Sequence, residues 1–453
     1  MSSAAVPRPR VGLLFDFDWD ALAHARLEGS YEFRRDGFDL FSFPSNARLI
    51  GFDLDRFARR LAVRAKRDGW VGVLSHHEQF GALAAALTAE RAGLGGPRAA
   101  ALVACQHKLH ARRVLQRVAP EACPRFEPLD ARYGEPIPDG VRYPCFAKPV
   151  KAAFSVLARR VDSRRELEQH TRFGRRELWV IRHLVEPFER VSRRLLPQAG
   201  TAHRLLLEEP VRGAQYNLDG WVRDGQVHVL GFVDSIMYPG TQAFMRFELP
   251  SRLPGAVRDR AVSIAQRFLT AVGFDQGFFN MEFIHDMASG RLSVVEFNPR
   301  LASQFGDLYR RVQGVDAHEM ALGLACGDDP AALATASTAV RSGAAAASFV
   351  FRAFAPADVP PMPSAAMRAE FARVFPDALL FVMPKTGHSL ARDFKWLGSQ
   401  RYGIVHLSGR DPQDLRQRCA AACQLFGWPL PYDHAEIEPR RDAALSSLQG
   451  ALT

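Results

Sequence analysis

One stretch of the sequence, residues 275–314, constrains what this chain can fold into more than any other. It predicts a β-hairpin followed by a helix, because two runs rich in apolar residues flank a polar turn that contains Gly290. Side chains alternate along a strand, so Asn280 and Glu282 share one face of the first strand. The second strand is expected to present four residues on one face: Leu292, Val294, Glu296 and Asn298.

An even register in this hairpin sets Glu282 and Glu296 side by side, since opposite residues of an antiparallel pair point the same way. Two carboxylates on an otherwise apolar hairpin repel each other and lose hydration, so they need a cation between them or a shared proton. Mg²⁺ prefers oxygen ligands, and Asn298 offers a carbonyl oxygen. Arg300, after the strand-ending Pro299, can hold an anion through two parallel hydrogen bonds. The alternative is a buried hairpin whose glutamates pair with lysines or arginines elsewhere.

A glutamate followed on the next strand by Glu-x-Asn-Pro-Arg resembles the metal-binding core of the ATP-grasp superfamily, which includes carboxylate–amine ligases and biotin carboxylases. The resemblance implies Glu282, Glu296 and Asn298 as metal ligands and Arg300 as a catalytic residue. It also implies ATP and Mg²⁺ as cofactors, with Mn²⁺ as a substitute. The implied fold class is mixed α/β and α+β. An ATP-grasp fold would lie between an N-terminal parallel α/β domain, called pre-ATP-grasp in the family, and a C-terminal accessory α+β region.

Two lysines and a strand extend the resemblance. Lys108 lies early in a predicted helix, where family members carry a lysine that reaches the phosphates of the nucleotide. Lys148 ends an apolar strand and precedes Pro149, like the family's second phosphate lysine, so it is also a candidate catalytic residue. Residues 205–213 resemble the hinge strand that binds adenine. The residues implied to bind the nucleotide are Lys108, Lys148, Ser155, Glu208, Glu209, Pro210, Val211 and Gln215.

The segment after Lys148 departs from the family pattern. Most members have a glycine-rich loop there that folds over the triphosphate, whereas residues 150–155 contain no glycine. Such a loop is less free to adopt positive φ and offers fewer close approaches of the backbone to phosphate. Lys151 is expected to supply charge in exchange, and the sequence leaves open whether the loop closes over phosphate.

Alternating strand and helix patterns near the N-terminus predict a small parallel α/β domain. His76, His77 and Glu78 follow a predicted strand at residues 70–75, at the end where open α/β sheets bind ligands. They are either substrate contacts or exposed loop residues. An alanine-rich run at residues 331–347 indicates a linker or a short helix. The chain is expected to divide into four parts: residues 1–104, the pre-ATP-grasp domain; 105–204, a linker helix and central lobe; 205–330, the lobe with the metal site; and 331–453, the accessory region.

Three aspartates, Asp16, Asp18 and Asp20, follow a short apolar strand near the N-terminus. They match imperfectly the nucleophile loop of haloacid-dehalogenase-type phosphatases, and they also suit a strand end with helix-capping aspartates. The net charge of +10 suits a phosphate-rich ligand, but the basic residues are scattered and form no nucleic-acid-binding motif. Six cysteines in so long a chain do not form a disulfide framework, and Cys419 and Cys423 are expected to pack as small apolar residues.

The sequence shows no signal-peptide pattern and no apolar run long enough to span a membrane, so a cytoplasmic location is expected. The predicted activity is that of an ATP-dependent ligase, which activates a carboxylate as an acyl phosphate for attack by an amine. Two alternatives stay open: a carboxylase-like enzyme that activates bicarbonate, and a nucleotide-binding regulator without turnover. The expected partners are small-molecule carboxylate and amine substrates, with neither membrane nor nucleic acid, and a homodimer is compatible with the sequence.

Overall fold

The computed structural model describes residues 8–40, 45–152, 157–337 and 341–432. The chain divides into two compact units. The first comprises Met1–Asp234 and Ser251–Arg341, and the second comprises Ser235–Pro250 and Ser342–Thr453. All the candidate site residues named above belong to the first unit.

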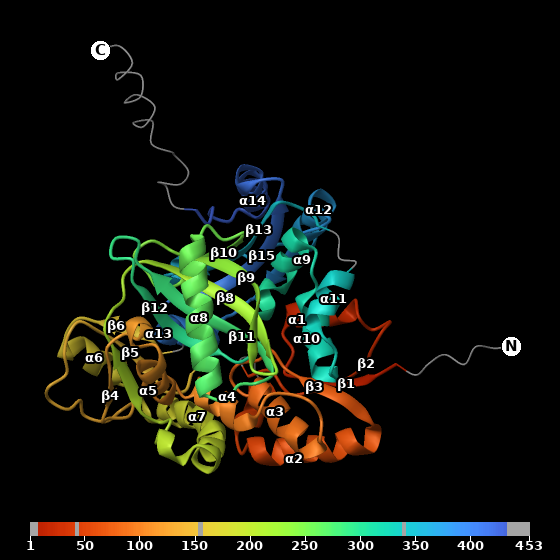
Figure 1. Ribbon diagram of the computed structural model, residues 1–453. Coiled ribbons are helices and arrows are strands. Elements are labelled where there is room, and N and C mark those ends of the chain that lie inside the picture. Colours follow the sequence, from red (N-terminus) through yellow and green to blue (C-terminus); the bar gives the residue numbers. More distant parts are fainter. Residues whose placement is uncertain (1–7, 41–44, 153–156, 338–340, 433–453) are drawn as a thin grey trace, which may run out of the picture. The chain divides into compact units, whose positions relative to one another are not determined.

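The first unit begins with a parallel sheet in the order β2 (Glu32–Asp36), β1 (Arg10–Leu14), β3 (Trp70–Leu74). Helices alternate with these strands, as predicted: α1 (Asp18–Ala25), the 3₁₀ helix η1 (Ser45–Leu49), α2 (Leu54–Asp68) and α3 (Gly81–Ala92). Helix α3 packs on the sheet, with α2 against it, and α10 (Ala317–Cys326), from much later in the chain, packs on β3 (Figure 1). Gly72 permits this approach, because a Cβ there would lie 2.8 Å from the carbonyl oxygen of Ala325.

A second, antiparallel sheet has the order β4 (Phe126–Leu129), β7 (Leu205–Glu208), β5 (Cys145–Pro149), β6 (Arg159–Val161). The helical segments of this part are α4 (Ala99–Gln106), α5 (Lys108–Val118), η2 (Pro120–Ala122), α6 (Arg164–Thr171), α7 (Arg175–Leu195) and η3 (Pro197–Ala199). Helix α5 begins at Lys108 because the side chain of His107 accepts a hydrogen bond from the backbone N–H of His110. Lys108 and Lys148 thus stand at the start of a helix and the end of a strand.

The third sheet of this unit runs β12 (Leu292–Asn298), β11 (Gly277–His285), β8 (Ala214–Arg223), β9 (Gln226–Met237), and β9 continues into the second unit. Helix α8 (Gly255–Ala271) lies along this sheet (Figure 1). The ring of Phe268 stacks on that of Phe297 with 3.8 Å between centres. The β8–β9 hairpin turns at Asp224 and Gly225, both with positive φ, as their residue types predict. The unit closes with η4 (Ser303–Phe305), α9 (Gly306–Gln313), α10 and α11 (Pro330–Ala336).

The second unit contains most of the region for which an α+β fold was predicted, and in addition residues 235–250. Its strands are ordered β10 (Phe244–Leu249), β13 (Ala345–Ala353), β15 (Gln400–Gly409), β14 (Leu379–Val382), with antiparallel pairing of β10–β13, β13–β15 and β15–β14. Its helices are η5 (Pro356–Asp358), α12 (Ala365–Val374), α13 (Gly387–Leu397) and α14 (Pro412–Phe426). Cys419 and Cys423 are free and buried in the apolar core of this unit, as predicted.

One sequence-based expectation needs correction: His76, His77 and Glu78 are 5–7% exposed, so the exposed-loop alternative is wrong. For the alanine-rich run at residues 331–347, the structure has a short helix at its start, α11, and β13 begins at Ala345. None of the helices in the described ranges is long and apolar enough to cross a membrane.

Candidate active site

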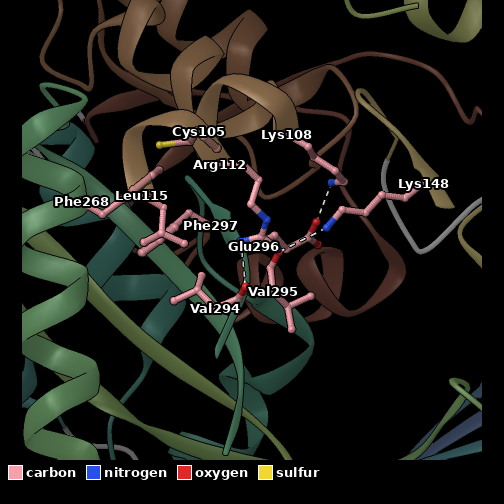
Figure 2. A pocket seen from close by; sticks show the side chains of 11 residues that line it. Cys105, Lys108, Arg112, Leu115, Lys148, Phe268, Val294, Val295, Glu296 and Phe297 are labelled. Atoms are coloured by element: carbon pink, nitrogen blue, oxygen red, sulfur yellow. Dashed lines mark hydrogen bonds and ion pairs between the residues drawn. The ribbon is translucent and has the colours of Figure 1, made fainter. Parts of the chain in front are cut away.

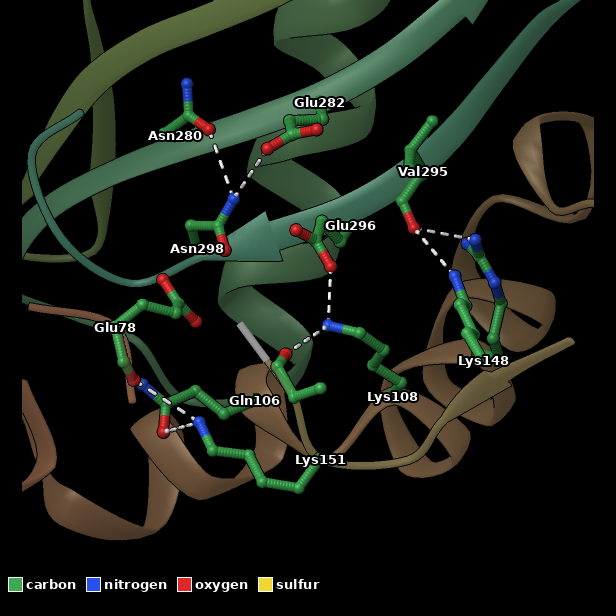
Figure 3. A network of polar contacts seen from close by, with 12 residues as sticks. Glu78, Gln106, Lys108, Lys148, Lys151, Asn280, Glu282, Val295, Glu296 and Asn298 are labelled. Atoms are coloured by element: carbon green, nitrogen blue, oxygen red, sulfur yellow. Dashed lines mark hydrogen bonds and ion pairs between the residues drawn. The ribbon is translucent and has the colours of Figure 1, made fainter. Parts of the chain in front are cut away.

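The β11–β12 hairpin sets the predicted acidic pair. Glu282 pairs in register with Glu296, and Asn280 pairs with Asn298. Nδ2 of Asn298 donates to Oδ1 of Asn280 at 3.2 Å and to Oε1 of Glu282 at 3.3 Å (Figure 3). Two carboxylates and two amides therefore gather at neighbouring positions of two adjacent strands.

The strict alternation predicted for β12 is wrong in the first half of the strand. The register shifts by one residue after Glu282, so that Phe283 pairs with Val294 rather than with Val295. This shift moves Val294, and Leu292 with it, off the face that carries the acidic pair. Strand β12 is also an edge of its sheet, so its outer carbonyl groups need partners from another element.

Arg112 of α5 supplies those partners. Its guanidinium donates to the carbonyl oxygens of Val294 and Val295 at 2.8 and 2.7 Å, and to the carboxylate of Glu208 at 2.5 and 3.2 Å. Glu208, at the end of β7, also pairs with Nζ of Lys148 at 2.8 Å. Burial alone would raise the pKa of Glu208, but the charges of Arg112 and Lys148 outweigh it and lower that pKa.

Sequence reasoning gave Arg112 no role, although a signal was present. Arg112 lies four residues after Lys108, so both cations lie on one face of α5. That face points toward β12, where Lys108 contacts Glu296 and Arg112 contacts the carbonyl oxygen of Val294.

Lys108 neutralises one member of the acidic pair. Its Nζ lies 2.5 Å from Oε2 of Glu296 and donates to the carbonyl oxygen of Ala152 at 3.2 Å (Figure 3). Burial would lower the pKa of Lys108, but Glu296 outweighs it and raises that pKa. Burial alone would raise the pKa of Glu296, but the charge of Lys108 outweighs it and lowers that pKa. Glu282 has the opposite shift, because burial and the neighbouring Glu296 carboxylate both raise its pKa. Without a cation the pair therefore keeps its proton on Glu282, and Glu296 carries the negative charge beside Lys108.

Lys148 and Lys151 are both deeply buried, and burial lowers the pKa of each to about 8. Nζ of Lys151 donates to Oε1 of Gln106 at 3.1 Å and to the carbonyl oxygen of Glu78 at 3.3 Å (Figure 3). The same nitrogen lies 4.8 Å from the ring centre of Phe188. These contacts favour a structural role for Lys151, in place of the expected contact with phosphate.

Arg300 pairs with Glu78, which lies in the loop after β3. Its Nε lies 3.0 Å from Oε2 of Glu78, and both side chains are largely buried. Glu78, a candidate substrate contact in the sequence, is therefore the residue that holds the candidate catalytic arginine.

The predicted nucleotide-binding residues occupy two regions. Glu209 accepts hydrogen bonds from Arg125 and Arg291, both at 2.8 Å, and half-buried Pro210 and Val211 follow it. Gln215, predicted to contact ribose, donates through Nε2 to Oε2 of Glu282 at 2.9 Å. It therefore lies beside the acidic pair. Ser155 lies outside the described residues.

A buried network behind the acidic pair was missed by sequence reasoning. Nδ2 of Asn280 donates to Oδ1 of Asn217 and of Asp219, both at 2.9 Å, and the hydroxyl of Tyr309 donates to Oδ2 of Asp219 at 2.7 Å. Burial raises the pKa of Asp219 to about 6, against the effect of these hydrogen bonds. A charged residue in the apolar strand β8 was the available signal.

A small pocket adjoins the cations (Figure 2). Its wall is charged on one side, where Lys108, Arg112 and Lys148 meet Glu296, and apolar on the other. The lining residues are Cys105, Lys108, Ala111, Arg112, Leu115, Lys148, Phe268, Val294, Val295, Glu296 and Phe297. The cavity has a volume of about 10 Å³, which is room for a single water molecule.

Comparison with known proteins agrees with this geometry. Residues 141–307 match the family model of the ATP-grasp domain, and this segment holds Lys148, Glu208 and the whole β11–β12 hairpin. A search of curated protein sequences finds no match.

Several solved structures are similar over almost the whole chain. The L-amino acid ligase from Bacillus licheniformis covers 93% of this chain and 98% of its own, with a TM-score of 0.65 and 15% identity. N5-carboxyaminoimidazole ribonucleotide synthetase from Thermus thermophilus covers 93% and 100%, with a TM-score of 0.59 and 18% identity. Carboxyaminoimidazole ribonucleotide synthase from Aspergillus clavatus, solved with ATP, covers 93% and 98%, with a TM-score of 0.60 and 14% identity. As the sequence resemblance predicted, this chain has the ATP-grasp fold and carries an ATP-grasp domain at residues 141–307.

Proposed function

We propose that this protein is an ATP-dependent ligase that activates a small-molecule carboxylate as an acyl phosphate and joins it to an amine. One observation carries the proposal. In the first unit, Lys108 contacts Glu296 of the acidic pair Glu282–Glu296, and buried Lys148 lies beside the same strand, paired with Glu208. Acidic oxygens that can hold a cation, beside lysines that can hold phosphate, are what transfer of a phosphoryl group requires.

The acidic pair fits a divalent cation. Glu282 and Glu296 face each other, and a cation between them would relieve the repulsion that raises the pKa of Glu282. Carboxylate and amide oxygens are the ligands that Mg²⁺ prefers. Glu282, Glu296 and Asn298 would hold Mg²⁺ or Mn²⁺, with the amide oxygen of Asn298 turned toward the ion. The bound cation would neutralise charge on the phosphate oxygens.

The nucleotide would lie between the second and third sheets of the first unit. Lys108 and Lys148 would contact its phosphates, and Glu208, held by Arg112, would keep Lys148 in position. The backbone of residues 209–211 would contact adenine, and Gln215 would contact ribose.

The reaction would proceed in two steps. An oxygen of the substrate carboxylate attacks the γ-phosphorus of ATP, the bond to ADP breaks, and an acyl phosphate forms. The amine nitrogen then attacks the acyl carbon, inorganic phosphate leaves and the nitrogen loses a proton. Lys148 and Arg300 would stabilise the negative charge of the transferred phosphoryl group, and Glu78 would orient Arg300.

Release of phosphate during incubation with ATP, Mg²⁺ and pools of amino acids tests the proposal. Amino acids are the first choice because one similar structure is that of an L-amino acid ligase. The proposal requires ADP and phosphate in equal amounts, with a condensed product found by mass spectrometry. Turnover that depends on bicarbonate and needs no amine would favour the carboxylase-like alternative. Tight ATP binding without phosphate release in any pool would favour the regulator.

A further inference from the structure

A second cluster of polar side chains lies in the first unit, on elements distant in the sequence. Asp20 comes from α1, His76 is the second residue after β3, and His318 lies in α10. Nε2 of His318 is 3.1 Å from Oδ1 of Asp20, and one potential ligand atom from each of the three residues lies within 4.8 Å of the others. The three side chains are 0%, 5% and 2% exposed, so the cluster is sealed from solvent.

The cluster is not satisfied by hydrogen bonds within the described part of the chain. Nε2 of His76 is buried and has no hydrogen-bond partner there, and the same holds for Nε2 of His24. The His24 ring lies beside the cluster, with its centre 5.6 Å from that of His318 and 6.1 Å from that of His76. Its Nδ1 lies 3.5 Å from a carboxylate oxygen of Asp16. A buried imidazole nitrogen without a partner is costly, so two such nitrogens in one place call for a ligand.

The donor set identifies the class of that ligand. Imidazole nitrogens with one carboxylate are typical ligands of divalent transition metals, whereas Mg²⁺ and Ca²⁺ prefer oxygen throughout. Two ligand atoms of a tetrahedral zinc ion, each about 2.0–2.1 Å from the metal, lie roughly 3.4 Å apart. The 3.1 Å between His318 and Asp20 is close to this separation.

The surrounding backbone holds these side chains in place. The His318 ring lies against Gly306, where a Cβ would be 2.6 Å from Cε1 of the ring, so a larger residue would displace it. Oδ2 of Asp20 accepts from the backbone N–H of Phe17 at 3.1 Å, which leaves Oδ1 directed at His318.

We propose that Asp20, His76 and His318 bind one divalent transition-metal ion, with Zn²⁺ as the best match, and that His24 is the nearest further nitrogen donor. The ion would join α1, the end of β3 and α10. Asp16, beside His24, would orient that ring as carboxylates do around bound metals. The site uses neither Glu282 nor Glu296, and the proposal does not depend on the proposed ligase activity.

Zinc binding to the full-length, chelator-treated protein tests the proposal, with excess Mg²⁺ present to occupy the acidic pair. The proposal requires one Zn²⁺ per chain with a Kd below about 1 µM and a higher Tm, since a buried metal stabilises the folded state. His76→Gln and Asp20→Asn should each weaken binding by about 100-fold or more. His388→Gln, at an exposed histidine of the second unit, is the matched control and should bind like the wild type.

X-ray absorption of the zinc-loaded wild type keeps the test decisive if the cluster variants fail to fold. Two or three imidazole ligands support the site, because the acidic pair offers oxygen ligands only. No zinc binding by the wild type in excess Mg²⁺ would overturn the proposal. A spectrum without imidazole, or wild-type zinc affinity in folded His76→Gln and Asp20→Asn, would overturn it equally.

Discussion

Nζ of Lys108 lies 2.5 Å from Oε2 of Glu296, so a candidate phosphate ligand is paired with a candidate metal ligand. Lys148 is paired in the same way with Glu208, at 2.8 Å. Each cation that we assign to phosphate therefore has a carboxylate partner in the structure. Binding of a metal–nucleotide complex would replace the Lys108–Glu296 contact by two others, lysine with phosphate and carboxylate with metal, so charge stays balanced throughout.

Glu296→Ala should abolish turnover while the protein stays folded. The substitution removes a proposed metal ligand, which costs several kcal/mol of charge stabilisation in the transition state and so lowers kcat by about two orders of magnitude or more. Steady-state phosphate release at saturating Mg²⁺ measures the effect, and circular dichroism checks the fold. Glu370→Ala, at an exposed glutamate of α12, is the control. A wild-type rate in folded Glu296→Ala would remove Glu296 from the metal site.

Lys148→Ala should raise the KM for ATP and lower turnover. Loss of one hydrogen bond to a charged group costs about 1.5–3 kcal/mol, or roughly 10- to 100-fold in affinity. The fold should survive because Glu208 keeps its contacts with Arg112. Lys148→Arg should rescue poorly, since a planar guanidinium differs in shape and reach from an ammonium. Calorimetric titration with a non-hydrolysable ATP analogue measures affinity directly, and unchanged affinity and rate in Lys148→Ala would make this lysine structural.

The pH dependence of kcat/KM for ATP should show a falling limb above about pH 8. Burial lowers the pKa of Lys148 to about 8, so the free protein loses this positive charge as the pH rises through that value, and phosphate binding weakens. Lys148→Arg, which stays charged, should lose the limb. Lys151→Met removes the other buried lysine with a pKa of about 8 and should keep it. If the falling limb disappeared in Lys151→Met and persisted in Lys148→Arg, the titrating group would be Lys151, and the prediction for Lys148 would be wrong.

The acidic hairpin could be predicted from the sequence because its geometry is local. Alternation along two adjacent strands and one turn fixes which residues face each other, and Glu282 does pair with Glu296. The register shift after Glu282 could not be predicted in this way. A one-residue bulge leaves the sequence pattern on either side of it intact. The residue that binds the carbonyl oxygen of Val295 at the bulge, Arg112, comes from another element.

Contacts distant in the sequence account for most of what sequence reasoning missed. Arg112 and Glu208 are 96 residues apart, and His318 and Asp20 are 298 apart. Such pairs depend on how helices and sheets pack, which neither periodicity nor turn chemistry encodes. The burial of Lys151 was missed for the same reason, because its partner Gln106 lies on a different element.

Lys151→Ala should destabilise the protein without a comparable loss of ATP affinity. The substitution opens a cavity and removes the donor to Gln106 and to the backbone of Glu78, at a cost of about 2–4 kcal/mol. Lys151→Met fills the same space and should cost less. Thermal unfolding measures stability, and calorimetry with the ATP analogue should give a Kd within about twofold of the wild type. A loss of ATP affinity in Lys151→Met, with stability unchanged, would return this lysine to the phosphate site.

Arg112→Met should be among the most destabilising substitutions in the first unit. The guanidinium is 4% exposed and satisfies the Glu208 carboxylate and two edge carbonyls of β12 at once. Removing one partner of a buried ion pair leaves the other uncompensated and costs about 3–5 kcal/mol, which Lys148 would offset only in part. Urea unfolding followed by circular dichroism gives the change. Arg117→Met, at an exposed position of the same helix, removes the same charge and should stay within about 0.5 kcal/mol of the wild type. If Arg112→Met unfolded at the wild-type urea concentration, the buried pair with Glu208 would contribute no net stability, and the arginine would be present for the site alone.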